Sequence, residues 1–308
     1  MHPVPQSAEP GFNGTGPAGT GRNAGDPAAA APRPLLSFLR RPVFAASPPG
    51  RLTVWRWLGW MCLLILLAYL SGSLNQILVH AFHWPVPART ASARFLTQPS
   101  WAAVAIMLVA PALEELGFRA FLSTAPAFIF TGLTFFLGYG YLLIQAEITP
   151  MPAAMPPAAV FTHYFQSFWV FLPAGAISLL LYRYRRDAVL GFFRRRAGWV
   201  FWASCILFGA AHTSLYVNHL VWWGFVLVLP QFVLGLGLAY LRASFGLRWS
   251  IAAHYAIDIP SVLGTWLYLS ASPSGLLHRG MLLTLSAAGL LVVAYGLVAL
   301  SRVARRTW

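Results

Sequence analysis

Apolar segments about 20 residues long recur along this chain, separated by short polar or basic stretches. A helix needs roughly 20 apolar residues to cross a bilayer, so the pattern predicts membrane-spanning helices. The expected fold is therefore all-α, a polytopic helical bundle with about eight transmembrane helices. The eight segments cover about residues 57–79, 100–123, 127–144, 160–182, 199–216, 221–240, 249–269 and 281–303.

The first 50 residues have a different composition. They are rich in Gly, Pro, Ala and Ser and contain no apolar run long enough for a core. Such a segment cannot bury enough apolar surface to offset the entropy of ordering it. The sequence therefore predicts a disordered cytoplasmic tail over residues 1–50, followed by a transmembrane bundle over residues 51–308.

The charge pattern supports a membrane protein. Only 9% of the residues are charged, and 58% are hydrophobic; soluble domains average about 25% charged residues. A net charge of +14 is compatible with binding to nucleic acid, but the arginines fall in clusters between apolar segments. Such clusters are typical of cytoplasmic loops. We therefore expect a lipid bilayer and no nucleic acid as partner.

The arginine clusters also predict the topology. Counting spans from a cytoplasmic N-terminus puts the clusters at 183–196, 242–248 and 302–306 on the cytoplasmic side. Both termini are then cytoplasmic, in agreement with the positive-inside rule. The expected location is the plasma membrane or a bacterial inner membrane, as an integral multi-pass protein.

Two adjacent carboxylates interrupt the second apolar segment. The chain has seven carboxylates in all, and Glu114 and Glu115 stand side by side. A charge at mid-bilayer costs about 2.5 kcal/mol or more, so such residues face a bundle interior and carry function. Glu115 and Arg119 are four residues apart, which predicts a structural ion pair on one helix face. Glu114 points about 100° away and needs a partner from another helix.

Polar groups that could meet Glu114 lie in two later segments. His212 follows Phe208 by one turn, and His254 and Asp258 are four apart on one face. A lone intramembrane histidine such as His212 is often only a hydrogen bond between helices. Taken together, four polar groups on three helices favour one shared, water-accessible cavity.

Three motifs in separate apolar segments resemble those of the CPBP family of intramembrane glutamic endopeptidases. This family is also called the CAAX prenyl protease type 2 or Abi family. The resemblance covers about residues 95–270, which would form the protease-like core. The motifs are E-E-x-x-x-R at Glu114, Glu115 and Arg119, F-x-x-x-H at Phe208 and His212, and H-x-x-x-N/D at His254 and Asp258.

The resemblance implies hydrolysis of a peptide bond in a membrane-associated protein or peptide, without a metal or other cofactor. Glu114 would be the general base, and His212 would hold the water and protonate the leaving amine. His254 and Asp258 would stabilise the oxyanion. Better-known members have asparagine where Asp258 stands, and an ionised carboxylate repels an oxyanion. Asp258 would therefore be protonated, or it would orient His254 as the donor.

Two other classes of function stay open at this level. The same residues could hold a metal in a metal-dependent protease, since Glu and His are zinc ligands. No H-E-x-x-H motif supports that interpretation. A non-enzymatic protein, such as a proton-coupled transporter or a peptide-immunity factor, would also use intramembrane Glu and His. Inverted repeats, which favour a transporter, are not evident in the sequence.

Overall fold

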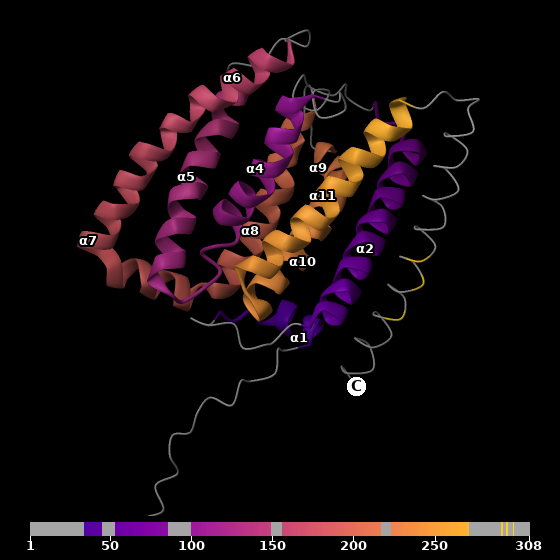
Figure 1. Ribbon diagram of the computed structural model, residues 1–308. Coiled ribbons are helices and arrows are strands. Elements are labelled where there is room, and N and C mark those ends of the chain that lie inside the picture. The colour runs from indigo at the N-terminus through magenta and orange to yellow at the C-terminus, as the bar shows by residue number, and fades with distance from the viewer. Residues whose placement is uncertain are drawn as a thin grey trace, which may run out of the picture. The chain divides into compact units, whose positions relative to one another are not determined.

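The computed structural model describes residues 34–44, 53–85, 100–148, 156–216 and 223–270, together with residues 291, 294 and 298. The regular elements in this part of the chain are all helical, which confirms the predicted all-α fold (Figure 1). They are α1 (Leu35–Arg40), α2 (Val54–Ala81), α4 (Trp101–Phe118), α5 (Pro126–Ile148), α6 (Pro157–Ser167), η1 (Phe168–Val170), α7 (Phe171–Arg195), α8 (Ala197–Ala211), η2 (His212–Leu215), α9 (Gly224–Leu227), α10 (Leu229–Phe245) and α11 (Leu247–Ser270).

Four stretches of the described helices are long and apolar enough to cross a membrane. They carry large apolar side chains on their outer faces, such as Leu172 and Leu179 of α7, which are about two-thirds exposed. Lipid is the environment in which that exposure is stable, so the chain is an integral membrane protein. The count of eight spans stays a prediction, because most of 281–303 lies outside the described residues. The four spans are Val54–Ala81, Pro126–Gln145, Phe165–Arg195 and Ala197–Leu215.

Several predicted boundaries were wrong. The fourth predicted helix does not end before the arginines, because α7 continues through them to Arg195 past a kink at Arg185. The second segment ends as a helix at Phe118 instead of about Ser123. The sixth begins at Leu229, where Pro230 occupies the first turn. A proline fits there because the first-turn N–H has no helical partner in any case.

The predicted tail contains a short structured segment. Helix α1 lies within residues 1–50, and its Phe38 is buried against the rings of Phe201 and Tyr240. The centroid distances are 5.3 and 5.4 Å, with edge-to-face geometry. The disorder prediction was therefore wrong for 34–44, where Phe38 and Phe44 are both buried in the hydrophobic core and anchor the segment. Of the rest of the predicted tail, residues 1–33 and 45–50 lie outside the described residues.

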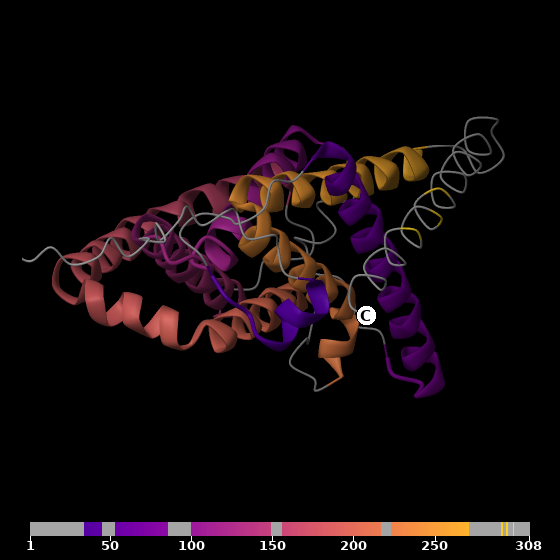
Figure 2. The same cartoon turned by 90° about the horizontal axis from the view of Figure 1, so that it is seen from below.

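Helix α10 packs directly against α2, α8 and α11, and α4 packs against α5 and α11. The view from below shows α11, in orange to yellow, crossing the indigo helix α2 (Figure 2). Gly237 of α10 allows the close approach of α2, since a Cβ there would overlap the Leu64 side chain. Small residues at helix contacts serve this purpose in membranes. The packing places α4, α8, α10 and α11 around one buried polar cluster.

The topology prediction can be tested directly. Reporter fusions after Arg196 and after Arg306 should both report a cytoplasmic position, because each follows an arginine cluster. A fusion after Ile148, at the other end of α5, should report the opposite side. An external signal after Arg196 or Arg306 would contradict the model of cytoplasmic termini.

Candidate functional site

Helix α4 carries the two adjacent glutamates and is fixed near its middle as well as at its ends. Ser100 caps its start by accepting a hydrogen bond from the Ala103 N–H at 3.1 Å. Pro111 lies inside the helix and cannot donate to the carbonyl of Met107. The Tyr255 hydroxyl of α11 donates to the neighbouring Leu108 carbonyl. This bond ties α4 to α11 where the helical hydrogen bonding is weakened.

The ion pair between Glu115 and Arg119 is present, as the spacing predicted. Arg119 Nη1 lies 2.9 Å from Glu115 Oε1, and both side chains are 0% exposed. The contact lacks the alignment of a hydrogen bond, so the attraction is chiefly that of two opposite charges. Removing either partner of such a completely buried pair would strongly destabilise the folded protein, because the remaining charge would be buried without a counter-charge.

Arg119 has a second neighbour, the aromatic ring of Phe208 on α8. The guanidinium carbon lies 3.6 Å from the ring centroid, close enough for a cation–π contact. Gly235 of α10 leaves room for this arrangement. A Cβ at that position would lie 3.0 Å from Phe208 and 3.4 Å from Arg119. The phenylalanine of F-x-x-x-H thus contacts the arginine of E-E-x-x-x-R.

Glu115 also binds two residues of α11. His254 Nδ1 lies 3.0 Å from Glu115 Oε1, and the Ser250 hydroxyl donates to Glu115 Oε2. Since a carboxylate accepts, Nδ1 of His254 carries the hydrogen in this contact. Ser250 and His254 are four residues apart and share a helix face. Glu115 is therefore held by three side chains, and it fixes the orientation of the His254 ring.

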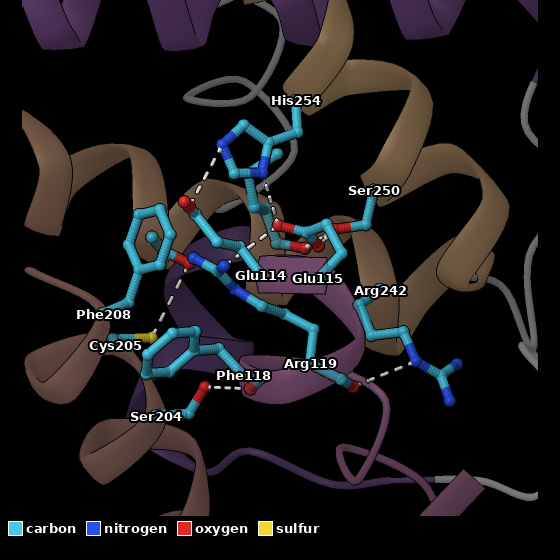
Figure 3. A network of polar contacts seen from close by, with 12 residues as sticks. Glu114, Glu115, Phe118, Arg119, Ser204, Cys205, Phe208, Arg242, Ser250 and His254 are labelled. Atoms are coloured by element: carbon cyan, nitrogen blue, oxygen red, sulfur yellow. Dashed lines mark hydrogen bonds and ion pairs between the residues drawn. The ribbon is translucent and has the colours of Figure 1, made fainter. Parts of the chain in front are cut away.

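Glu114 faces the other edge of the same imidazole (Figure 3). Its Oε2 lies 3.7 Å from His254 Nε2, and its Oε1 accepts from the Tyr139 hydroxyl at 3.4 Å. Asp258 Oδ2 lies 3.3 Å from the same Nε2. The Glu114 side chain is 13% exposed and that of Asp258 40% exposed, so the site is most open toward Asp258. Glu114, His254 and Asp258 converge, as expected.

His212 lies beside this group and is not paired with Glu114. It occupies the first position of η2, and its Nδ1 lies 2.7 Å from the Phe208 carbonyl. A carbonyl only accepts, so Nδ1 donates and the neutral ring has its free lone pair on Nε2. Both His212 and His254 contact the Phe208 ring, with centroids 4.7 and 5.8 Å away. No hydrogen bond or ion pair in the described residues joins His212 to Glu114.

Sequence reasoning missed the groups that hold the end of α4. Arg242 of α10 is buried; its Nε donates to the Arg119 carbonyl at 3.2 Å and its Nη2 to the Ala120 carbonyl at 3.0 Å. The Ser204 hydroxyl of α8 donates to the Phe118 carbonyl. These carbonyls lie at the end of α4, where no following helical turn supplies N–H groups to donate to them. Helix periodicity was the available signal, since Arg242 lies two turns after Gly235 and Ser204 one turn before Phe208.

Replacing Arg242 should destabilise the protein without touching the carboxylates. Arg242→Gln removes the buried cation that donates to two carbonyls. We expect a loss of about 2–4 kcal/mol in the free energy of unfolding, and Arg242→Lys, which reaches one carbonyl, should lose less. Thermal unfolding in detergent measures both. Arg248→Gln, at an exposed position, is the matched control and should change stability by under about 0.5 kcal/mol. Equal losses in Arg242→Gln and Arg248→Gln would contradict the role of Arg242.

The arrangement has the parts of an acid–base site. A carboxylate and two imidazoles lie around one aromatic side chain, in surroundings that are largely closed to bulk solvent. Such surroundings strengthen interactions with charge that develops during a reaction. Among the described residues, no group of three His, Cys, Asp or Glu side chains is arranged to hold a metal ion.

Comparison with protein families gives one match. A model described as Rce1-like, type II CAAX prenyl endopeptidase, matches residues 96–260, more than half of the 308 residues. The chain belongs to this family. The resemblance predicted over about residues 95–270 is thereby confirmed, and membership indicates a membrane-embedded peptidase. The match spans all the residues of the site, from Glu114 to Asp258. Neither curated proteins nor solved structures gave a match.

Proposed function

We propose that this protein is an intramembrane glutamic endopeptidase, with Glu114 as the base that activates water. The observation that supports it is the contrast between the two adjacent glutamates. Glu115 is held by Arg119, Ser250 and His254, whereas Glu114 Oε2 is buried and accepts no hydrogen bond from the described residues. A base must have a free oxygen within reach of the proton that it removes. Glu114 Oε2 meets that requirement.

The proposed reaction assigns a role to each neighbouring group. Glu114 takes a proton from water, the water oxygen bonds to the peptide carbonyl carbon, and the carbonyl oxygen becomes an oxyanion. His254 acts as the imidazolium in this proposal: its Nδ1–H donates to Glu115, and its Nε2–H stabilises the oxyanion. When the carbon–nitrogen bond breaks, the amine needs a proton. That proton is the one that Glu114 took from water: Nε2 of His212, whose lone pair is left free by the Phe208 carbonyl, accepts it and passes it to the amine, so that Glu114 and His212 return to their starting forms.

Asp258 acts in this proposal by orienting His254. Its carboxylate lies 3.3 Å from Nε2, so it holds the hydrogen of that nitrogen in place before substrate binds. Of the two roles that the sequence left open for Asp258, this one needs no protonated carboxyl group. An asparagine could make the same contact through its amide oxygen. Asp258→Asn should therefore retain turnover within about tenfold of the wild type, a much smaller effect than removing a base. Kinetics on purified protein would measure it.

The proposed substrate is a membrane-associated protein or peptide. The site lies inside a bundle whose outer face is apolar, so a substrate that is itself bound to the membrane has the shortest route to it. The family description names prenylated CAAX proteins, and we extend that substrate class to this chain only as a candidate.

Proteomics of the membrane fraction tests the function. Cells with the wild-type protein should contain new protein termini that are absent with Glu114→Gln at equal expression. Purified protein should cleave peptides containing those termini, and a chelator should leave the rate unchanged. Identical termini in both strains would contradict the endopeptidase proposal. Loss of cleavage with the chelator, restored by added metal, would instead favour the metal-dependent alternative.

A further inference from the structure

Helix α7 changes direction at Arg185, away from the carboxylate site. The backbone there has φ −133° and ψ 16°, outside the helical range. Before this residue α7 is apolar and exposed, as at Leu179 and Leu180. After it the helix runs across one end of the bundle, the lower end in Figure 1 and the near face in Figure 2. The change of direction coincides with the change from lipid-facing to basic sequence.

The half of α7 that follows Arg185 has two faces. Leu190 and Phe193 are buried against the hydrophobic core, with Val189 packed beside them. Phe192, Arg194 and Arg195 are exposed. An apolar inner face with arginines and an exposed aromatic outside is typical of a helix that lies at a membrane interface. Arginine side chains there can reach lipid phosphates while their stems cover apolar surface.

A cavity of about 480 Å³ opens at the break itself. Three of the side chains around it are arginines, Arg183, Arg185 and Arg186, and Asp187 is the lining carboxylate. Two of these guanidinium groups lie over tyrosine rings: Arg183 is 5.5 Å from the Tyr184 centroid and Arg186 5.3 Å from that of Tyr182. No carboxylate in the described residues is within ion-pair distance of the three arginines. Their charge is therefore available to an external anion.

We propose that this cavity, the α7 break, binds the phosphate group of an anionic phospholipid. The planar guanidinium group of arginine can donate two parallel hydrogen bonds to phosphate oxygens, so it matches phosphate in geometry as well as in charge. Free phosphate has the same chemistry, but the position favours a lipid. The apolar, exposed face of α7 at Leu179 and Leu180 leads directly to the break and offers a path for acyl chains. Anionic lipids of a cytoplasmic leaflet attract basic segments next to the membrane. This binding site is independent of the proposed peptidase activity.

Native mass spectrometry of the full-length protein in detergent tests the proposal. The probes are dioleoyl phosphatidylglycerol, dioleoyl phosphatidylcholine and inorganic phosphate. We expect phosphatidylglycerol to bind at least tenfold more tightly than phosphatidylcholine. The variant with Arg183→Gln, Arg185→Gln and Arg186→Gln should lose at least tenfold in affinity for phosphatidylglycerol. Arg185→Gln alone should lose about threefold, which keeps the test valid if the triple variant folds poorly.

A charge-matched control distinguishes binding at the α7 break from a general attraction of the anionic lipid to the positively charged protein. Arg40→Gln, Arg41→Gln and Arg56→Gln together remove three exposed arginines of the same chain. This variant should lose less than threefold in affinity for phosphatidylglycerol. Equal losses in the two triple variants would overturn the assignment to the α7 break. Inorganic phosphate that binds as tightly as phosphatidylglycerol would overturn the assignment to a lipid.

Discussion

Glu114→Gln should reduce peptide hydrolysis by about 10²–10⁴-fold while the protein stays folded. The amide keeps the shape of the side chain and its contact with the Tyr139 hydroxyl, which approaches Oε1 at 3.4 Å. It removes the carboxylate oxygen that faces His254 Nε2 at 3.7 Å. Because Glu114 is not an ion-pair partner of Arg119, the substitution leaves no buried arginine without its counter-charge. The loss should therefore appear in kcat rather than in thermal stability.

Kinetics on detergent-purified protein, with unfolding curves for each variant, would measure this. Asp187→Asn is the matched control, because it makes the same carboxylate-to-amide change at an exposed position on α7. It should keep the wild-type rate. If folded Glu114→Gln turns over at a near-normal rate while folded Glu115→Gln is inactive, the roles of the two glutamates are the reverse of those proposed.

Much of this site could be predicted because helix periodicity is local. The four-residue spacings of Glu115 with Arg119 and of His254 with Asp258 put each pair on one face, and both contacts are present. The residue types predicted that these side chains face the interior of the bundle, since charges inside apolar segments must face other protein groups. The three motifs and their order were enough to identify the family that the match over residues 96–260 confirms.

Contacts between helices could not be predicted in the same way. The sequence grouped Glu114 with His212, His254 and Asp258 in one cavity, but it did not show that the imidazole in contact with Glu114 is His254, which also binds Glu115. Which face of α11 turns toward α4 depends on packing, and no spacing within one helix reveals it. The contacts that hold the ends of the helices could not be predicted either. Arg242 looked like one more cytoplasmic arginine, yet it donates to two carbonyls just after α4.

Glu115→Gln should act mainly on stability. It leaves the Arg119 guanidinium, which is 0% exposed, without its counter-charge. Breaking a buried pair by removing one partner costs about 3–5 kcal/mol. The Phe208 ring, 3.6 Å from the guanidinium, remains as a cation–π neighbour. That contact contributes about 2 kcal/mol when desolvated and is already present in the wild type, so it cannot offset the loss. Thermal unfolding in detergent should show a large drop.

The double variant Glu115→Gln with Arg119→Met should separate the two roles of Glu115. It removes both charges and refills the volume with an apolar side chain, so it should regain most of the lost stability. Activity should recover less, because His254 Nδ1 then faces a neutral amide in place of the carboxylate at 3.0 Å. Comparing kcat and unfolding for the two single variants and the double variant makes the distinction. Equal instability of Glu115→Gln and the double variant would show that the unpaired Arg119 is not the cause. Full recovery of kcat in the double variant would show that the charge of Glu115 does not act through His254, leaving the ion pair as its whole contribution.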